Sequence, residues 1–303
     1  MNPVSWFQTA RYIRDLAPRA IIFQWWHPFF GPAYRYIAKH TQQENCTQIF
    51  LCHNVEPHES SFFDKRLLQY AYAPIHHFVV QSSLEKTRLQ QYKPQAEIRV
   101  HVHPVYSFFA NPAPDQQLVK LPASEITLLY FGLVRRYKGL DILLEAMPLI
   151  RESVDAHLMV VGEFYDEKEP YLQQIRTLGI TDSVTIVDEY VPDEQVGWYF
   201  QQADVVVLPY RHATQSGIIP IAYNFTVPVI ATHVGGLPDV VFEGETGYLV
   251  PPEDSTALAD TVAKFARQRN QIDFQSHITE HLDMFSWKSL RTTLLEMITT
   301  STH

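Results

Sequence analysis

Three cations, Arg135, Arg136 and Lys138, stand in a glycine-flanked turn near the middle of the chain. Arg135 and Lys138 lie between Gly132 and Gly139, directly after the apolar run 126–132. Backbone N–H groups at the start of a helix favour negative charge, and Arg and Lys add charge-assisted hydrogen bonds. This turn could therefore hold a phosphate or a diphosphate. A solvated basic turn is the alternative that the local sequence leaves open.

A second turn of small residues, 212–217, follows the apolar run 204–210. Backbone N–H groups of Gly217 and Ile218 would be free to reach an anion here, with Ser216 as a cap or a direct ligand. Taken alone, the turn is equally an ordinary capped helix. A third turn, 232–239, contains two adjacent glycines and is most simply interpreted as a tight turn.

Polar residues gather in a fourth turn, 52–59, directly after the apolar run 48–53. Two His, two Glu and an Asn exceed what a loop needs to close a turn. The spacing of His53 and His58 without a helix is poor for zinc, so we expect no metal site. His53 could equally be a core histidine with satisfied hydrogen bonds at the end of a strand.

Short apolar runs, which alternate with helix-length segments, must position these turns. The alternation predicts parallel strands joined by crossover helices, with ligands at the carboxyl ends of the strands. The predicted strands are 20–26, 48–53, 77–81, 97–102, 126–132, 156–162, 183–190, 204–210 and 227–232. We expect an α/β protein of two Rossmann-like domains, 1–110 and 126–285, joined by a proline-containing linker at 111–125. A helix in 286–303 is expected to pack back on the first domain.

Composition excludes several classes of protein. The 303 residues are 46% hydrophobic and 19% charged with a net charge of −9, which argues against disorder and nucleic-acid binding. Two cysteines cannot form a disulfide framework, and no apolar run is long enough to span a membrane. We therefore expect a cytoplasmic protein, with peripheral contact at the inner membrane face left open.

The turns, in this order, resemble glycosyltransferase family 4 (group 1), whose members are retaining, metal-independent enzymes of the GT-B fold. The resemblance is carried by YFGLVRRYKGLDILLEA, VVGE, DEYVPDEQVGWYFQQADVVVLPY and VPVIATHVGGLPDVVFEGETGYLVPPED, which lie between residues 128 and 254. No GxGxxG motif occurs, which argues against a dinucleotide-dependent dehydrogenase. An epimerase of the same architecture is disfavoured because the FGLVRRYKGLD turn is a transferase feature.

The resemblance implies transfer of a sugar from a nucleoside diphosphate sugar to a saccharide or lipid-linked acceptor, in cell-surface polysaccharide or glycolipid assembly, with no cofactor. It implies catalytic roles for His53, Arg135 and Lys138. The implied donor contacts are Arg135, Lys138, Ser216, Gly217 and Ile218 for the diphosphate, Thr214 and Gln215 for the sugar or ribose, and main-chain groups near Tyr190 and Val191 for the base.

The chain departs from the family pattern at its donor site. Leu133 stands where members usually have Arg, so the phosphate role moves to Arg135. The family's two glutamates, near Ala213 or Thr214 and near Ile221 or Ala222, are absent, with Gln215 as the candidate for the first one's contact. We interpret this as an altered donor site. A noncatalytic nucleotide-sugar-binding or partner protein is the alternative.

The beginning of the chain also departs from the pattern. It opens at a predicted helix, 5–16, where a family member has a strand and a glycine-rich loop, and Gly31 is the one glycine before Gly132. We therefore expect the first domain to lack its leading strands. The aromatic segment 25–36 is expected to pack inside the protein, with an acceptor-binding or membrane-facing surface as the alternative.

Overall fold

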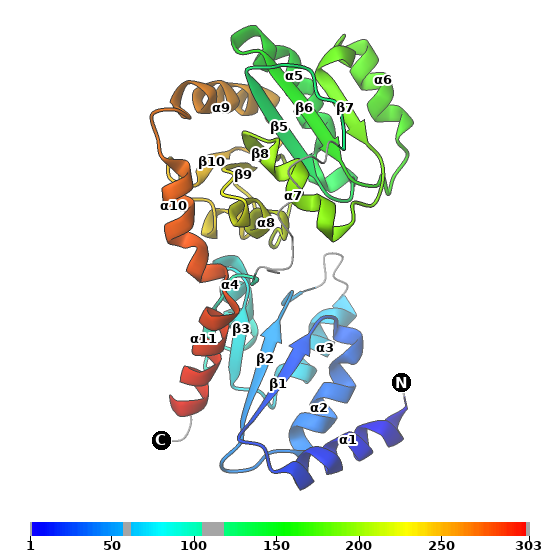
Figure 1. Cartoon of the computed structure of the whole chain (residues 1–303). Coiled ribbons are helices and arrows are strands. Elements are labelled where there is room, and N and C mark those ends of the chain that lie inside the picture. The colour runs from blue at the N-terminus through cyan, green and yellow to red at the C-terminus, as the bar shows by residue number, and fades with distance from the viewer. Residues whose placement is uncertain (1, 57–61, 105–117, 301–303) are drawn as a thin grey trace. The chain divides into compact units, whose positions relative to one another are not determined.

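The computed structural model describes residues 2–56, 62–104 and 118–300, which form two compact units. The first unit comprises residues 1–103 and 286–303, and the second comprises 104–285 (Figure 1). The predicted linker 111–125 lies partly outside the described residues.

The first unit is a parallel sheet of four strands in the order β1-β2-β3-β4 among the described residues. Its strands are β1 (Ala20–Trp25), β2 (Thr47–Cys52), β3 (His77–Val80) and β4 (Glu97–Val100). Its helices are α1 (Pro3–Leu16), α2 (Gly31–His40), α3 (Phe62–Tyr72), α4 (Ser83–Tyr92) and α11 (Trp287–Thr300). Asn2 and Ser82 cap α1 and α4 through their side-chain oxygens, which explains where these helices begin.

Every residue of strand β2 is buried. Because alternate side chains point to opposite sides of a strand, both faces of β2 are covered. Phe50 belongs to an aromatic core with Trp25, whose ring is stacked at 5.6 Å, and with Tyr72. Leu51 faces the other way and packs with Leu290 of α11. The last helix of the chain therefore covers the second face of the first sheet.

The aromatic segment 25–36 does not pack inside the protein as a whole. Trp25 is fully buried at the end of β1, but Trp26 is 59% exposed and Phe29 is 58% exposed. Both follow the strand end, where the chain leaves the two packed faces of the sheet. The prediction of internal packing is therefore wrong for these two side chains.

The second unit is a parallel sheet of six strands in the order β10-β9-β8-β5-β6-β7. Its strands are β5 (Ile126–Phe131), β6 (Ala156–Val161), β7 (Val184–Val187), β8 (Val205–Leu208), β9 (Val229–Thr232) and β10 (Gly247–Val250). Its helices are α5 (Leu140–Ser153), α6 (Glu169–Thr177), α7 (Asp193–Gln201), α8 (Ile218–Asn224), α9 (Ser255–Gln268) and α10 (Phe274–His281). The sequence did not predict β10, a four-residue strand between a glycine and a Pro-Pro pair.

The strand order reverses between β5 and β8, which are neighbours in the sheet although three helices and two strands separate them in sequence. At such a switch point the loops after the two strands turn to opposite faces and leave a crevice where ligands bind. The turns 132–139 and 209–217 follow β5 and β8, so this fold brings two of the predicted sites together (Figure 1).

In the part of the chain that the structure describes, every helix is too short or too polar to cross a lipid bilayer.

Candidate active site

Arg135 and Lys138 occupy the turn after β5. Lys138 is partly buried, and its Nζ lies 3.5 Å from the position that a Cβ on Gly132 would take. Burial, followed by repulsion from Arg135, lowers the pKa of Lys138 from 10.5 to about 8. Among the described residues no carboxylate lies within 4.0 Å of either cation. Among the described residues these two positive charges of the turn therefore lack a carboxylate partner.

The turn after β8 braces this cationic turn. Gly139 has a φ of +70°, and a Cβ there would lie 2.0 Å from the carbonyl oxygen of Pro209, so only glycine permits the approach. The backbone N–H of Arg211 donates to the carbonyl of Tyr137 at 2.8 Å, and its guanidinium donates to the carbonyl of Arg136 at 2.7 Å.

Arg211 differs from Arg135 in having carboxylate partners. Its guanidinium donates to both oxygens of Asp141, at 2.8 and 2.7 Å, and to Glu253 at 3.2 Å. Burial alone would raise the pKa of Asp141. The hydrogen bonds and the charge of Arg211 have the opposite and larger effect, so the pKa of Asp141 lies below its ordinary value. The charge of Arg211 is therefore used within the protein, and its role is structural.

The loop 213–217 lies under tight backbone constraint. Gly235 has a φ of +56°, and a Cβ there would lie 1.4 Å from the carbonyl oxygen of Ala213. The Ser216 hydroxyl accepts a hydrogen bond from the Ile218 N–H at 3.3 Å, so that N–H already has a partner. No atom lies within 4 Å of the position that a Cβ on Gly217 would take, so the space there is open.

Gln215 in this loop and Ile218 directly after it bear on ligand binding. The Oε1 of Gln215 is buried and has no hydrogen-bond partner among the described groups. Ile218 Cδ1 lies 3.3 Å from the Cβ position of Gly132, so the loops after β5 and β8 meet at Lys138. The structure thus brings Lys138 and Ile218, two of the predicted donor contacts, close to Gly132, and their role in donor binding stays a prediction.

A cavity of about 380 Å³ opens beside the cationic turn, at the carboxyl ends of β5, β6 and β7. Its lining comprises Phe131, Gly132, Leu133, Gly162, Glu163, Glu189, Tyr190, Val191, Asp193, Val196 and Ile221. Tyr190 and Val191, predicted near the base, are among them. Ile221 lines the cavity while Ala222 is buried, so an apolar side chain forms the wall at one of the two positions considered for the second glutamate.

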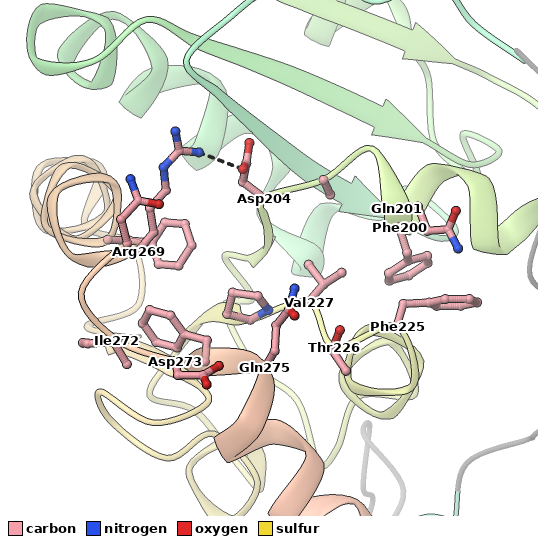
Figure 2. Close-up of a pocket in the computed structure, with 15 residues that line it drawn as sticks. Phe200, Gln201, Asp204, Phe225, Thr226, Val227, Arg269, Ile272, Asp273 and Gln275 are labelled. Carbon is pink, nitrogen blue, oxygen red and sulfur yellow. Dashed lines mark hydrogen bonds and ion pairs between the residues drawn. The ribbon is translucent and has the colours of Figure 1, made fainter. Parts of the chain in front are cut away.

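A larger cavity, of about 600 Å³, lies at the opposite edge of the same sheet, beside the amino ends of β8 and β9 (Figure 2). Its arginine, Arg269, donates to Asp204 at 2.7 Å and to the Glu125 carbonyl at 2.8 Å. Because this charge is compensated, and because ligands of parallel sheets bind at the carboxyl ends of strands, the smaller cavity is the better candidate.

His53 lies in the first unit, directly after β2. It is partly buried. Its Nε2 is 2.7 Å from Gln24 Oε1, and its Nδ1 is 3.2 Å from Gln81 Nε2. The Trp26 ring is stacked on it at 4.1 Å. Burial, and then the charge of His103, lower its pKa, so the imidazole is held neutral between two glutamines.

The other polar residues of the turn 52–59 have structural partners where they are described. Glu56 accepts a hydrogen bond from the Tyr92 hydroxyl, and burial followed by this bond raises the pKa of Tyr92 to about 12. The Val55 N–H donates to the buried Glu85. His58 and Glu59 lie outside the described residues. In the described ranges, no group of three His, Cys, Asp or Glu residues is placed to hold a metal ion.

Two contacts of the cationic turn come from the loop after β6, and neither was predicted from the sequence. The Tyr165 ring lies under the guanidinium of Arg135, with Cζ 3.8 Å from the ring centroid. The Asp166 carboxylate accepts from the Arg136 N–H at 3.0 Å. The available signal was the pair of aromatic residues that directly follows the VVGE motif.

Together, these features define a two-unit parallel α/β protein with a cationic crevice at a switch point of its second sheet. Residues 125–268 match the family of glycosyl transferases group 1, and this part of the chain is a domain of that family. The chain is 31% identical over 182 residues to a D-inositol 3-phosphate glycosyltransferase of Arthrobacter sp. (strain FB24), a match that covers 58% of this chain and 43% of that protein. The chain thus matches less than half of the length of this relative.

Solved structures share the fold over nearly the whole chain. A sucrose-phosphate synthase from Thermosynechococcus elongatus has a TM-score of 0.74 and 22% identity, covering 98% of this chain and 77% of that one. Anabaena HepE in complex with UDP and glucose has a TM-score of 0.73 and 15% identity, covering 96% of this chain and 81% of that one. The predicted α/β class is confirmed: the chain has two parallel sheets and matches glycosyltransferase structures of the GT-B fold.

Proposed function

We propose that this chain is a retaining glycosyltransferase that moves a sugar from a nucleoside diphosphate sugar to a saccharide or lipid-linked acceptor. The observation that carries the proposal is the pair Arg135 and Lys138, two cations without a carboxylate partner among the described residues, at the switch point of a group 1 domain. The name of the Arthrobacter relative and the UDP and glucose in the HepE structure support this donor class.

In the proposed reaction the bond between the anomeric carbon and the donor diphosphate breaks, and a bond to the acceptor oxygen forms on the same face. Negative charge grows on the leaving diphosphate, and Arg135 and Lys138 stabilise it. A donor phosphate oxygen takes the acceptor proton, so no protein base is required. The two cations supply the positive charge that a metal supplies in other transferases. For His53, a role at the sugar is what the family resemblance implies.

The cavity of about 380 Å³ is assigned to the nucleoside. Main-chain groups at Tyr190 and Val191 would bind the base. The unpartnered Gln215 Oε1, with Thr214 beside it, would accept hydrogen bonds from hydroxyls of the sugar or ribose. Ser216, Gly217 and Ile218 would contact the diphosphate through the open space at Gly217.

Binding tests the proposal first. A thermal-shift screen with uridine, guanosine and adenosine diphosphates and their sugars should find one that raises the unfolding temperature, because a ligand of the folded state stabilises it by mass action. Arg135→Ala and Lys138→Ala should each weaken that ligand by about 10- to 150-fold, as expected for charge-assisted hydrogen bonds. Unchanged affinity in both variants would contradict the proposed donor site.

Turnover separates the enzyme from a noncatalytic nucleotide-sugar-binding protein. The enzyme releases nucleoside diphosphate from the donor, in the presence of EDTA as well as in its absence. Proton NMR of the first product should show the anomeric configuration of the donor. Tight donor binding with no release under any acceptor would favour the noncatalytic alternative.

The proposed location is the cytoplasm, with peripheral contact at the inner membrane face. The exposed rings of Trp26 and Phe29 support this contact. Sedimentation with liposomes should carry the wild-type protein down and leave the Trp26→Ala, Phe29→Ala double variant in the supernatant. A Tyr12→Ala variant, altered at another exposed aromatic residue, is the control.

A further inference from the structure

The loop after β6 forms hydrogen bonds with the residues directly before and after Arg135. Before it, the Val134 N–H donates to the Glu163 carbonyl at 2.8 Å, and the Tyr165 N–H donates to the Val134 carbonyl at 3.1 Å. After it, the Arg136 N–H donates to the Asp166 carboxylate at 3.0 Å. The backbone around Arg135 is therefore held against this loop as if by a short additional strand.

The side chain of Tyr165 contacts the guanidinium of Arg135. Its ring is 65% exposed, so it does not belong to the core, yet the Arg135 Cζ lies 3.8 Å from the ring centroid. At this distance the guanidinium plane rests on the ring face. The Nε of Arg135 is buried and has no hydrogen-bond partner among the described groups.

The way in which Arg135 is held contrasts with that of Arg211. Two carboxylates, Asp141 and Glu253, fix Arg211 and in doing so cancel its charge. An aromatic ring contacts the face of a guanidinium, and the N–H groups point outward from its edge. A ring can therefore fix the orientation of an arginine and leave both its charge and its edge free for an anion.

We propose that Tyr165 is a positioning residue for the donor diphosphate, which it serves by holding the guanidinium of Arg135 in place without neutralising it. The inference rests on the proposed function, because it assumes that Arg135 binds a diphosphate. Tyr165 is the second of the two aromatic residues that directly follow VVGE, in the loop after β6.

The test is binding of inorganic pyrophosphate and of UDP, measured by isothermal titration at pH 7 on the full chain. Tyr165→Leu removes the ring face and should weaken pyrophosphate by about 3- to 10-fold, the range of a partly solvated cation–π contact. Tyr165→Phe keeps the ring and should bind within about 2-fold of the wild-type protein. Tyr12→Leu, altered at a tyrosine of equal exposure in the first unit, should leave binding unchanged.

A double-mutant cycle distinguishes positioning from an independent effect. In the Arg135→Ala background, Tyr165→Leu should cause no further loss, because the ring acts through the guanidinium. An equal loss in both backgrounds overturns the inference. A loss confined to UDP, with pyrophosphate unaffected, also overturns it, because the ring would then contact the nucleoside.

The outcome for the proposed function can be read separately. If the wild-type protein binds pyrophosphate and Arg135→Ala abolishes binding while Tyr165→Leu does not, the donor site stands and the inference fails. If the wild-type protein binds neither pyrophosphate nor any nucleoside diphosphate, the proposed function fails, and the inference falls with it.

Discussion

Replacing Lys138 by Met should move two quantities in opposite directions, stability upward and donor affinity downward. The ammonium lies against Gly132, and burial with repulsion from Arg135 lowers its pKa to about 8. At pH 7 the amine is still protonated, so the folded protein carries a desolvated charge that unfolding returns to water. Methionine fills a similar space without the charge.

The size of the effect follows from the pKa. Each pKa unit is worth about 1.4 kcal/mol, so a fall from 10.5 to about 8 corresponds to about 3 kcal/mol. Water at the open side of the crevice screens part of this. We therefore expect Lys138→Met to raise the free energy of unfolding by about 1 to 3 kcal/mol at pH 7.

The sign of the pH dependence is fixed by the two pKa values. Above about pH 8 the folded amine loses its proton, whereas the unfolded amine keeps its proton up to about pH 10.5. Between these pH values the unfolded state binds more protons than the folded state. Through Lys138, the free energy of unfolding of the wild-type protein therefore rises with pH, and the difference in this free energy between the wild-type protein and Lys138→Met becomes smaller. Urea unfolding followed by circular dichroism at pH 7 and pH 10 measures this.

The matched control is Lys264→Met. Lys264 is 45% exposed in its side chain, and its Nζ lies 3.4 Å from Glu243. This change should alter the free energy of unfolding by no more than about 0.5 kcal/mol.

Ligand binding completes the test. Lys138→Met should weaken pyrophosphate at pH 7 by about 10-fold or more, because a charge-assisted bond is lost. A variant that is no more stable than the wild-type protein at pH 7, or that binds pyrophosphate equally well, would refute the reasoning about this site.

Three further changes probe the walls of the crevice. Gly235→Ala should destabilise the second unit by about 2 kcal/mol or more, seen as a lower unfolding temperature, because a Cβ would lie 1.4 Å from the Ala213 carbonyl oxygen; an unchanged temperature would mean that the two loops do not meet. Arg211→Met leaves the Asp141 carboxylate without its partner and should cost about 1 to 3 kcal/mol at pH 7. Since the pKa of Asp141 is lowered in the folded protein, this loss should shrink in urea titrations as pH falls below the ordinary range of Asp, and a loss independent of pH would rule out the charge interaction. Ile221→Glu places a carboxylate on the cavity wall and should tighten a nucleoside diphosphate sugar by about 3- to 10-fold in titration calorimetry while leaving pyrophosphate unchanged; equal effects on both ligands would contradict the assignment of this wall to the nucleoside.

Hydrophobic patterning was sufficient to locate most strands. The runs 126–132 and 156–162 are mostly apolar, as buried parallel strands are, and they correspond to β5 and β6, each of which ends one residue earlier than predicted. Strand β10 was not predicted, because its four residues, which begin with a glycine and end before a proline, are too few to distinguish a strand from a turn. The exposure of Trp26 was not predicted, because apolar character alone does not show where the chain leaves the core at the end of a strand.

Local sequence located the cationic turn but did not distinguish the charges within and around it. Arg135 and Arg211 are equally basic in sequence, yet carboxylates from two distant segments neutralise Arg211 and an aromatic ring supports Arg135. In the same way, Glu56 resembled a functional residue until Tyr92 proved to be its partner.

From the amino-acid sequence we could predict the parallel α/β class, the family resemblance and the position of the two turns at the switch point, because periodicity and turn chemistry are properties of neighbouring residues. Three-dimensional contacts were needed to show which cations lack a carboxylate partner, that burial lowers the pKa of Lys138 to about 8, and that the Tyr165 ring supports Arg135. Charge compensation and burial depend on groups that are far apart in the chain, and folding alone brings those groups within contact distance.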